Sequence, residues 1–192
     1  MGLRSLISPS PCRTQERRKG TPMNAIVSVT QDWGIGKNNR LLVRNREDML
    51  RFKQLTMGGT VVMGRKTFES FPAGPLKGRR NIVVTRDAHY ADAHPGIECA
   101  TSPMEALLLA KADSADKVWL IGGESLYREL LPYCERCLVT RNQVSVPADA
   151  YFPNLDEDSA WELECVEGSS QTPEGIPYDF ATYRNLDQRD SY

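Results

Sequence analysis

The chain has 192 residues, of which 40% are hydrophobic and 26% charged, and its formal net charge at neutral pH is −1. This length suits one globular domain with a core of its own, and no apolar run is long enough to span a membrane. The balance of 24 basic and 25 acidic residues argues against a nucleic-acid-binding protein, which relies on a basic surface.

The first 22 residues differ in composition from the rest of the chain. They carry five basic residues against the single acid Glu16, and their only apolar run, Leu6-Ile7, is too short for a secretory signal. We expect residues 1–22 to be a disordered leader or extension, with a weak transit peptide as the alternative. Residues 23–192 are then expected to form a single domain.

Short apolar runs alternate with helix-like segments along most of the chain. Strands are expected at 25–30, 60–63, 81–85, 97–100 and 117–121, and helices at 47–57, 66–71, 103–112 and 124–131. The polar segment 31–46 is expected to be a long loop of the kind that often serves as a lid. From residue 137 onward, after the last expected helix, only strands are expected, at 137–144, 161–166 and 178–183. This order predicts an α/β fold with a mainly parallel sheet and an antiparallel edge.

The five cysteines include Cys134 and Cys137, whose C-x-x-C spacing is typical of redox and zinc sites. A zinc site would need further ligands, and no second pair exists. A redox pair would begin a helix, which lowers a thiol pKa, whereas this pair follows one. We therefore expect no metal, two reduced thiols at a helix-to-strand turn, and a cytoplasmic protein.

Two segments, 60–67 and 118–125, each combine a buried strand, a glycine and the first turn of a helix. Neither matches a P-loop or the dinucleotide fingerprint. Helix N-termini attract phosphate, and Arg65 with Lys66 in one segment would favour a pyrophosphate. Thr85-Arg86, at the end of another expected strand, would favour a 2′-phosphate. From these residues alone, dinucleotide binding and ordinary strand-to-helix turns are equally open.

Asp48 lies four residues before Phe52 and seven before Leu55, which places it on the apolar face of the expected helix 47–57. A buried carboxylate requires a partner, and no basic residue of the chain is obviously placed to neutralise it from that face. An amidine-like ligand edge would do so. Capping is an equally open interpretation, because Asn45 can cap this helix and an acid suits its first turn.

Several motifs in this order and spacing resemble the dihydrofolate reductase family, over about residues 24–184. They are Ile35-Gly36, Asp48 with Phe52-Lys53, 62–70 (VMGRKTFES), 75–86 (PLKGRRNIVVTR), 121–127 (IGGESLY) and 148–153 (ADAYFP). The resemblance, to the bacterial chromosomal type, implies a three-layer α-β-α fold. Its mixed sheet would have eight strands, mainly parallel, with an antiparallel C-terminal edge.

The resemblance also implies an activity, the reduction of dihydrofolate to tetrahydrofolate with NADPH, in support of one-carbon metabolism and thymidylate synthesis. Hydride would reach pterin C6, with protonation at N5. Asp48 would bind pterin N3 and the 2-amino group, and Thr140 would support Asp48. The expected partners are dihydrofolate and antifolate inhibitors, with no nucleic acid or membrane, and the protein is expected to be a monomer.

The remaining site residues follow from the same resemblance. Arg79 would hold the glutamate α-carboxylate, a fork geometry that lysine does not reproduce. The rest of the substrate side would comprise Val27, Met49, Phe52, Lys53, Phe71, Leu76 and Ile121. The cofactor side would comprise Ser28, Ile35, Gly36, Gly64, Arg65, Lys66, Thr67, Thr85, Arg86, Gly122, Gly123, Glu124, Ser125, Leu126 and Tyr127.

One stretch departs from the family pattern. Val43 stands where the family usually has Trp, and Arg46 stands near an expected Pro; we expect an active enzyme with altered loop closure. Two other interpretations remain. One is a related NADPH reductase of riboflavin synthesis, which would have no use for Asp48 and Arg79 together. The other is a non-catalytic nucleotide-binding protein on the same scaffold.

Overall fold

The computed structural model describes residues 23–189, so the expected leader at 1–22 lies outside the described residues. The strands are β1 (Met23–Val29), β2 (Gly34–Lys37), β3 (Arg40–Leu41), β4 (Thr60–Gly64), β5 (Arg80–Val84), β6 (Glu98–Ala100), β7 (Val118–Gly122), β8 (Cys134–Asn142), β9 (Ala150–Tyr151), β10 (Trp161–Gln171) and β11 (Pro177–Asn185). The helices are α1 (Arg46–Thr56), α2 (Arg65–Glu69), α3 (Pro103–Ala110) and α4 (Glu124–Leu130), with 3₁₀ turns η1 (Tyr90–Ala93), η2 (Ala115–Lys117) and η3 (Leu131–Tyr133).

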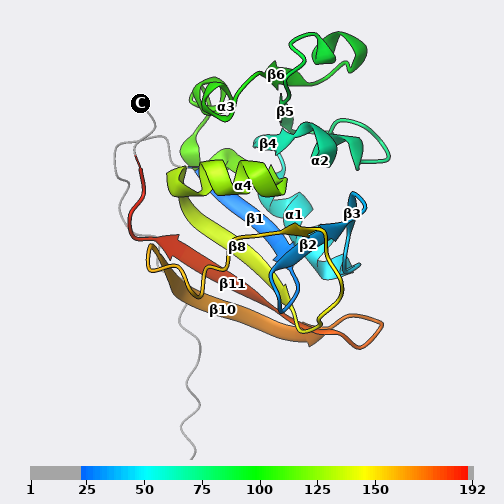
Figure 1. The fold of residues 1–192 in the computed structure, drawn as a ribbon, viewed down its shortest axis with the longest axis vertical. Coiled ribbons are helices and arrows are strands. Elements are labelled where there is room, and N and C mark those ends of the chain that lie inside the picture. Colours follow the sequence, from blue (N-terminus) through cyan, green and yellow to red (C-terminus); the bar gives the residue numbers. More distant parts are fainter. Residues whose placement is uncertain (1–22, 190–192) are drawn as a thin grey trace, which may run out of the picture.

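The central sheet has eight strands in the order β10-β11-β8-β1-β7-β4-β5-β6 (Figure 1). The pairs from β8 to β6 are parallel, and β10, β11 and β8 pair antiparallel. This arrangement confirms the predicted mainly parallel sheet with an antiparallel C-terminal edge. The parallel strands β1, β4, β5 and β7 all end at the same edge of the sheet.

The segment 31–46 is not a long loop throughout, as its polarity predicts. It contains β2 and β3, which pair with each other and with β9 as a second, three-stranded sheet. Trp33 anchors this sheet, because its indole is buried and stacks on Phe152 with 6.2 Å between ring centroids. The pairing partner β9 lies more than 100 residues downstream, which is why local sequence does not predict it.

Helices cover both faces of the central sheet, as a three-layer fold requires. Leu107 of α3 and Leu126 of α4 pack in one core cluster, and Phe52 of α1 and Phe68 of α2 pack in the other. Successive strand residues face opposite sides. The α1–α2 face is the one that carries the polar side chains described below. No helix in the described part of the chain is long and apolar enough to cross a membrane.

Cys134 and Cys137 do not lie at a helix-to-strand turn, as the sequence predicts. Both belong to β8 and are fully buried, because the strand begins three residues earlier than expected, directly after η3. Burial raises the pKa of both thiols, which is opposite to the shift that redox chemistry needs. Among residues 23–189, no group of three or more His, Cys, Asp or Glu side chains is placed to hold a metal ion.

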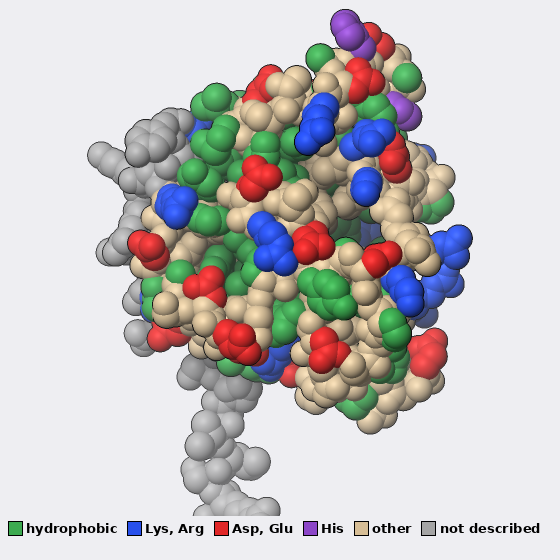
Figure 2. All heavy atoms as spheres, viewed as in Figure 1, with side chains coloured by type: hydrophobic (Ala, Val, Ile, Leu, Met, Phe, Trp, Pro, Cys, Tyr) green, Lys and Arg blue, Asp and Glu red, His purple; other side chains and the backbone are tan. Residues whose placement is uncertain are grey.

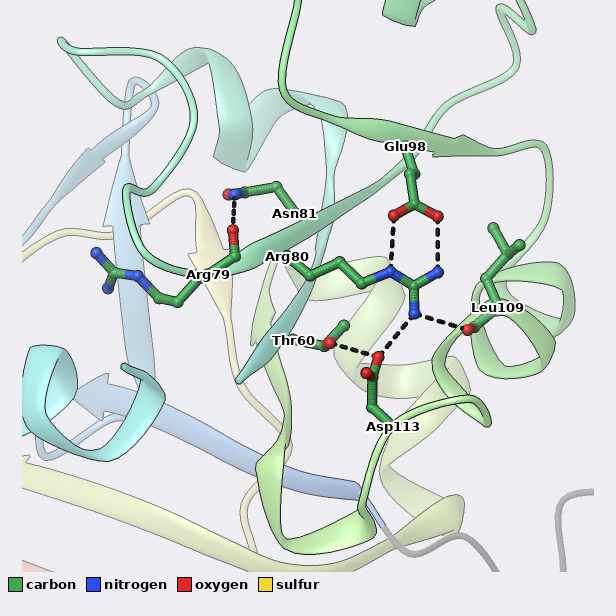
Figure 3. A network of polar contacts seen from close by, with 7 residues as sticks. All are labelled: Thr60, Arg79, Arg80, Asn81, Glu98, Leu109 and Asp113. Atoms are coloured by element: carbon green, nitrogen blue, oxygen red, sulfur yellow. Dashed lines mark hydrogen bonds and ion pairs between the residues drawn. The ribbon is translucent and has the colours of Figure 1, made fainter. Parts of the chain in front are cut away.

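Hydrogen bonds of the Arg80 side chain connect β5 to β6 and α3, and through Asp113 to β4 (Figure 3). Its guanidinium donates to both oxygens of Glu98, each at 2.6 Å, to Asp113 at 2.7 Å and to the Leu109 carbonyl at 2.9 Å. Thr60 donates to the same Asp113 oxygen. The hydrogen bond from Arg80 lowers the pKa of Glu98, and hydrogen bonds from Thr60 and Arg80 lower the pKa of Asp113.

We expect Arg80→Leu to lower the free energy of unfolding at neutral pH by about 1–2 kcal/mol, the scale of hydrogen bonds to a partly exposed charge. A depressed carboxyl pKa stabilises the fold above its unfolded-state value, and this contribution disappears as pH falls. The stability difference between Arg80→Leu and wild type should therefore narrow in acid. Urea titrations at neutral and acid pH measure it. Arg184→Gln, which removes an exposed pair with Glu162, is the control and should change stability little.

Candidate active site

Helix α1 presents Asp48 to the end of β8. Asn45 caps this helix, with its side-chain oxygen accepting from the backbone N–H of Glu47 at 3.1 Å and of Asp48 at 3.2 Å. The cap fixes the first turn, and Thr140 of β8 donates its hydroxyl to Asp48 Oδ1 at 2.5 Å. Asn45 therefore fills the capping role, which leaves the Asp48 side chain free for a different one.

The environment of Asp48 favours its neutral form. Burial raises its pKa, and the Thr140 hydrogen bond and the positive charge of Arg51 lower it by less. The sequence showed no basic residue obviously placed to neutralise Asp48 from its helix face; Arg51 supplies such a charge, but it does not offset the effect of burial. A carboxyl group whose pKa is raised by burial while an arginine charge acts on it is a candidate functional group. Two N–H donors of a ligand edge would stabilise its ionised form.

Apolar side chains lie on the same face of the sheet as Asp48. Phe52, Phe71, Leu76 and Ile121 are partly buried and pack against one core cluster, whereas Met49 is 51% exposed beside them on α1. Lys53 is exposed in the last turn of the helix. A flat, apolar ligand with a polar edge toward Asp48 fits such a surface.

Arg79 lies at the outer end of this apolar surface. In Figure 3 it points away from Arg80, toward α1. Its Nη1 donates to Thr56 Oγ1 at 3.1 Å, its Nε and Nη2 donate to the Lys77 carbonyl, and its guanidinium carbon lies 5.9 Å from the Phe52 ring centroid. Partial burial lowers the pKa of Arg79. These contacts hold the fork in place while keeping donors available for a carboxylate.

The glycine turns after β4 and β7 touch each other through Thr67. A Cβ on Gly122, whose φ is +131°, would lie 3.1 Å from Thr67 Oγ1, and one on Gly123 would lie 3.3 Å from it. A Cβ on Gly64 would lie 3.7 Å from the Gly123 nitrogen. Gly64 and Gly123 begin α2 and α4 with no side-chain cap. Two sets of backbone N–H groups therefore converge, as phosphate binding between them requires.

Basic side chains accompany these turns. Arg65 and Lys66 are exposed in α2, with Arg65 Nη1 3.6 Å from a Glu69 carboxylate oxygen. Thr85 is buried just after β5, where its hydroxyl accepts from the backbone N–H of Asp87, and Arg86 beside it is exposed. Figure 2 shows a hollow between α2, the end of α4 and the β2–β3 segment, with Lys and Arg side chains on its upper rim. The rim would attract an anionic ligand.

Three further residues of the predicted site lie on β1 and β2. Ser28 is in register with Thr140 on the neighbouring strand, and Ile35 and Gly36 lie in β2, where Asp149 donates its backbone N–H to the Gly36 carbonyl at 3.0 Å. Val43, which follows β3, is buried beside Ser28.

Other predicted residues have their side chains in the core or turned toward other elements. Val27, Leu126 and Tyr127 pack in the core cluster on the α3–α4 face, and the Tyr127 hydroxyl donates to the Ile26 carbonyl at 2.7 Å. Glu124 accepts from the backbone N–H of Tyr151, and Ser125 is exposed. If these positions contact a ligand, Val27 and Leu126 do so through their backbone.

Arg51 also lies near Asp48, and no sequence motif pointed to it. Its guanidinium lies over the Phe180 ring, 4.5 Å from the centroid, and 3.9 Å from Glu167. The signal available was its spacing of three residues from Asp48, which places both on one helix face. Phe180 and Glu167 lie on the C-terminal strands, and no local pattern connects them to α1.

Three comparisons with known proteins agree on one family. The family model for dihydrofolate reductase matches residues 22–185. The dihydrofolate reductase of Neisseria gonorrhoeae is 36% identical over 82% of this chain and 94% of its own length, and that of Mycobacterium tuberculosis is 41% identical over 69% of this chain and 80% of its own length. A solved structure, dihydrofolate reductase from Enterococcus faecalis complexed with NADP(H) and RAB-propyl, matches with a TM-score of 0.75 at 30% identity, covering 88% of this chain and 98% of the other.

Proposed function

Since the chain belongs to the dihydrofolate reductase family and is therefore an NADPH-dependent oxidoreductase, we propose how its own residues carry out the reaction. The carboxylate of Asp48 binds the pterin ring through N3–H and the 2-amino group. The observation that carries this assignment is the hydrogen bond from Thr140 to Asp48 Oδ1 beside the apolar surface of Phe52 and Ile121. It leaves the second carboxylate oxygen to a ligand.

The residues present fit NADPH. The cradle of Gly64, Gly122 and Gly123 is one that side chains would fill, and Arg65, Lys66 and Arg86 supply positive charge for the pyrophosphate and 2′-phosphate. When bound, NADPH supplies a hydride to pterin C6. The protein supplies position and charge: the negative charge of Asp48 favours the protonation of N5, Arg79 holds the glutamate α-carboxylate, and the apolar surface excludes water.

The first test is an assay of the purified protein with NADPH and dihydrofolate, with and without methotrexate. We expect the near-ultraviolet absorbance of NADPH to fall, and methotrexate to block the fall. Bound NADPH without turnover would contradict the proposal and favour a non-catalytic nucleotide-binding protein on this scaffold.

The product, tetrahydrofolate, would supply one-carbon metabolism and thymidylate synthesis. We place this activity in the cytoplasm, because Cys134 and Cys137 are free, buried thiols, as in proteins of a reducing compartment. Expression in a reductase-deficient strain tests the cellular role, since rescue should remove the need for added thymidine.

The monomeric state stays a prediction that light scattering of the purified protein would test.

Gly122 offers a test of the cofactor side. We expect Gly122→Ala to weaken NADPH binding at least about tenfold and to lower the free energy of unfolding by roughly 2 kcal/mol. The added Cβ meets Thr67 Oγ1 at 3.1 Å, and Ala disfavours a φ of +131°. Fluorescence titration with NADPH and thermal melting measure the two effects.

Gly175→Ala is the matched control for this variant. Gly175 also has a positive φ, +81°, but a Cβ there would have no atom within 4 Å, and it lies between β10 and β11, outside the proposed site. It should lose some stability and keep its NADPH affinity. Equal losses of affinity in both variants would contradict the assignment of Gly122 to the cofactor site.

A further inference from the structure

One row of side chains crosses the three strands of the antiparallel edge. Thr140 of β8 is paired with Phe180 of β11, and Phe180 is paired with Glu167 of β10. Directly paired residues on neighbouring strands project from the same face of a sheet. Thr140 donates to Asp48 of α1, so this row faces helix α1.

Helix α1 contacts the row at two adjacent points. Asp48 accepts from Thr140, and Arg51, three residues later, lies over the Phe180 ring at 4.5 Å from the centroid and 3.9 Å from Glu167. Residues at i and i+3 lie on one helix face, so the carboxylate and the guanidinium are neighbours against the sheet. The Arg51 side chain is 19% exposed, which makes its position better defined than that of a surface arginine.

The two contacts of Arg51, with Glu167 and with Phe180, contribute differently to holding its side chain in place. The ion pair with Glu167 involves a carboxylate that is 58% exposed, and pairs of this kind contribute little by themselves. The aromatic ring is the firmer support, because a guanidinium over a ring face is attracted to it and loses less hydration than an ammonium. Phe180 therefore fixes where the charge lies, and Glu167 orients it.

The charged and titratable groups around Asp48 and Arg51 come from two further elements, β10 and α4. Glu167 and Cys165 of β10 face Arg51, and Tyr127 of α4 is buried within the influence of Asp48. Burial raises the pKa of Tyr127, so its phenol is neutral at neutral pH. Arg51 is thus the group that favours the ionised carboxylate through charge, alongside the Thr140 hydrogen bond.

We infer that Arg51 is a positioning residue for the substrate site: anchored on Phe180 and Glu167, it holds the first turns of α1 against the antiparallel strands and keeps a fixed positive charge beside Asp48. This inference rests on the proposed role of Asp48 in binding the pterin ring. It concerns a residue outside the motifs that carry the family resemblance. It also involves β10 and β11, which contribute no residue to the proposed site.

The experiment compares Arg51→Gln and Arg51→Lys with wild type in two assays. The first is folate binding without NADPH, followed by tryptophan fluorescence from acid to alkaline pH. The second is steady-state turnover of dihydrofolate. For Arg51→Gln we expect folate affinity at neutral pH to fall roughly three- to tenfold, the scale of coupling within one charged network. Its loss of binding in acid should begin at a higher pH, because Asp48 becomes harder to ionise.

Arg51→Lys should keep the wild-type pH midpoint of folate binding, because it retains the positive charge. It should lose part of the folate affinity, because lysine lacks the planar guanidinium fork. The control Arg184→Gln removes another arginine of the antiparallel strands and its pair with Glu162, and it should match wild type in both assays. A pH midpoint that does not move in Arg51→Gln, or that moves equally in Arg51→Lys, would overturn the inference. If wild type itself neither binds folate nor reduces dihydrofolate, the proposed function fails instead.

Discussion

Replacing Asp48 by Asn is expected to lower kcat/KM for dihydrofolate at neutral pH by about 10²–10⁴-fold, the range measured for groups that assist proton transfer. Asn keeps the size of the side chain and an oxygen that accepts from Thr140. It loses the negative charge that favours a proton on the pterin ring, and its amide group presents donors where the ligand also has donors. The loss should therefore appear in kcat as well as in KM.

The same substitution is expected to stabilise the fold at neutral pH. Burial raises the pKa of Asp48 above its ordinary value, so the folded state binds its proton more tightly than the unfolded state does. At a pH below the unfolded-state pKa the carboxyl group is protonated in both states, and its ionisation does not change the free energy of unfolding. At a pH above the folded-state pKa it is ionised in both states, and burying the charge lowers the free energy of unfolding. Asp48→Asn should thus melt at a higher temperature than wild type at neutral pH, with the difference shrinking in acid.

Glu47→Gln is the matched control, because Glu47 is an exposed acid in the same first turn. It should keep its turnover, and both variants should bind NADPH within about twofold of wild type, since neither touches the glycine turns. Retention of turnover in Asp48→Asn would remove Asp48 from the catalytic role. Loss of NADPH binding in the same variant would point to a change of fold rather than of chemistry.

Replacing Arg79 by Leu is expected to raise KM for dihydrofolate about 10- to 100-fold, from the loss of charge-assisted hydrogen bonds to the glutamate carboxylate. The change in kcat should be small, because the carboxylate lies far from the reacting atoms and is bound equally in the ground and transition states. Arg79→Lys should recover only part of the affinity, since an ammonium does not reproduce the planar fork. Steady-state kinetics of the three proteins measure these effects.

A truncated substrate provides the control for Arg79. Dihydropteroate lacks the glutamate group, so wild type and Arg79→Leu should use it with similar KM values. A large difference between the two proteins on dihydropteroate would mean that Arg79 acts through Thr56 and Phe52, which it contacts, rather than on the substrate carboxylate. The structural role and the binding role are thereby separated.

The order of strands and helices was predictable because it depends on local pattern. Val61 and Val62 are buried on opposite faces, as an unbroken apolar run between two helices predicts for a parallel strand. Ser102, a residue type that favours helix N-caps, caps α3, with its hydroxyl accepting from the Glu105 N–H. Boundaries were less accurate: α3 ends at Ala110 and β8 begins at Cys134, since packing and not propensity decides where an element stops.

By itself, the sequence determined the fold class and the family, and it supplied the candidate residues for the chemistry. Asp48, Arg79 and the glycines at 122 and 123 are recognisable because their chemistry is specific to their types and their spacing is local. The tertiary structure decided which side chains meet. Three contacts join residues that are about 90 to 130 positions apart in the chain. They are the pairing of β2 with β9, the hydrogen bond from Thr140 to Asp48, and the contact of Arg51 with the Phe180 ring. Such contacts depend on strand register across the whole sheet, and register is fixed only when the apolar faces of all the strands are buried together.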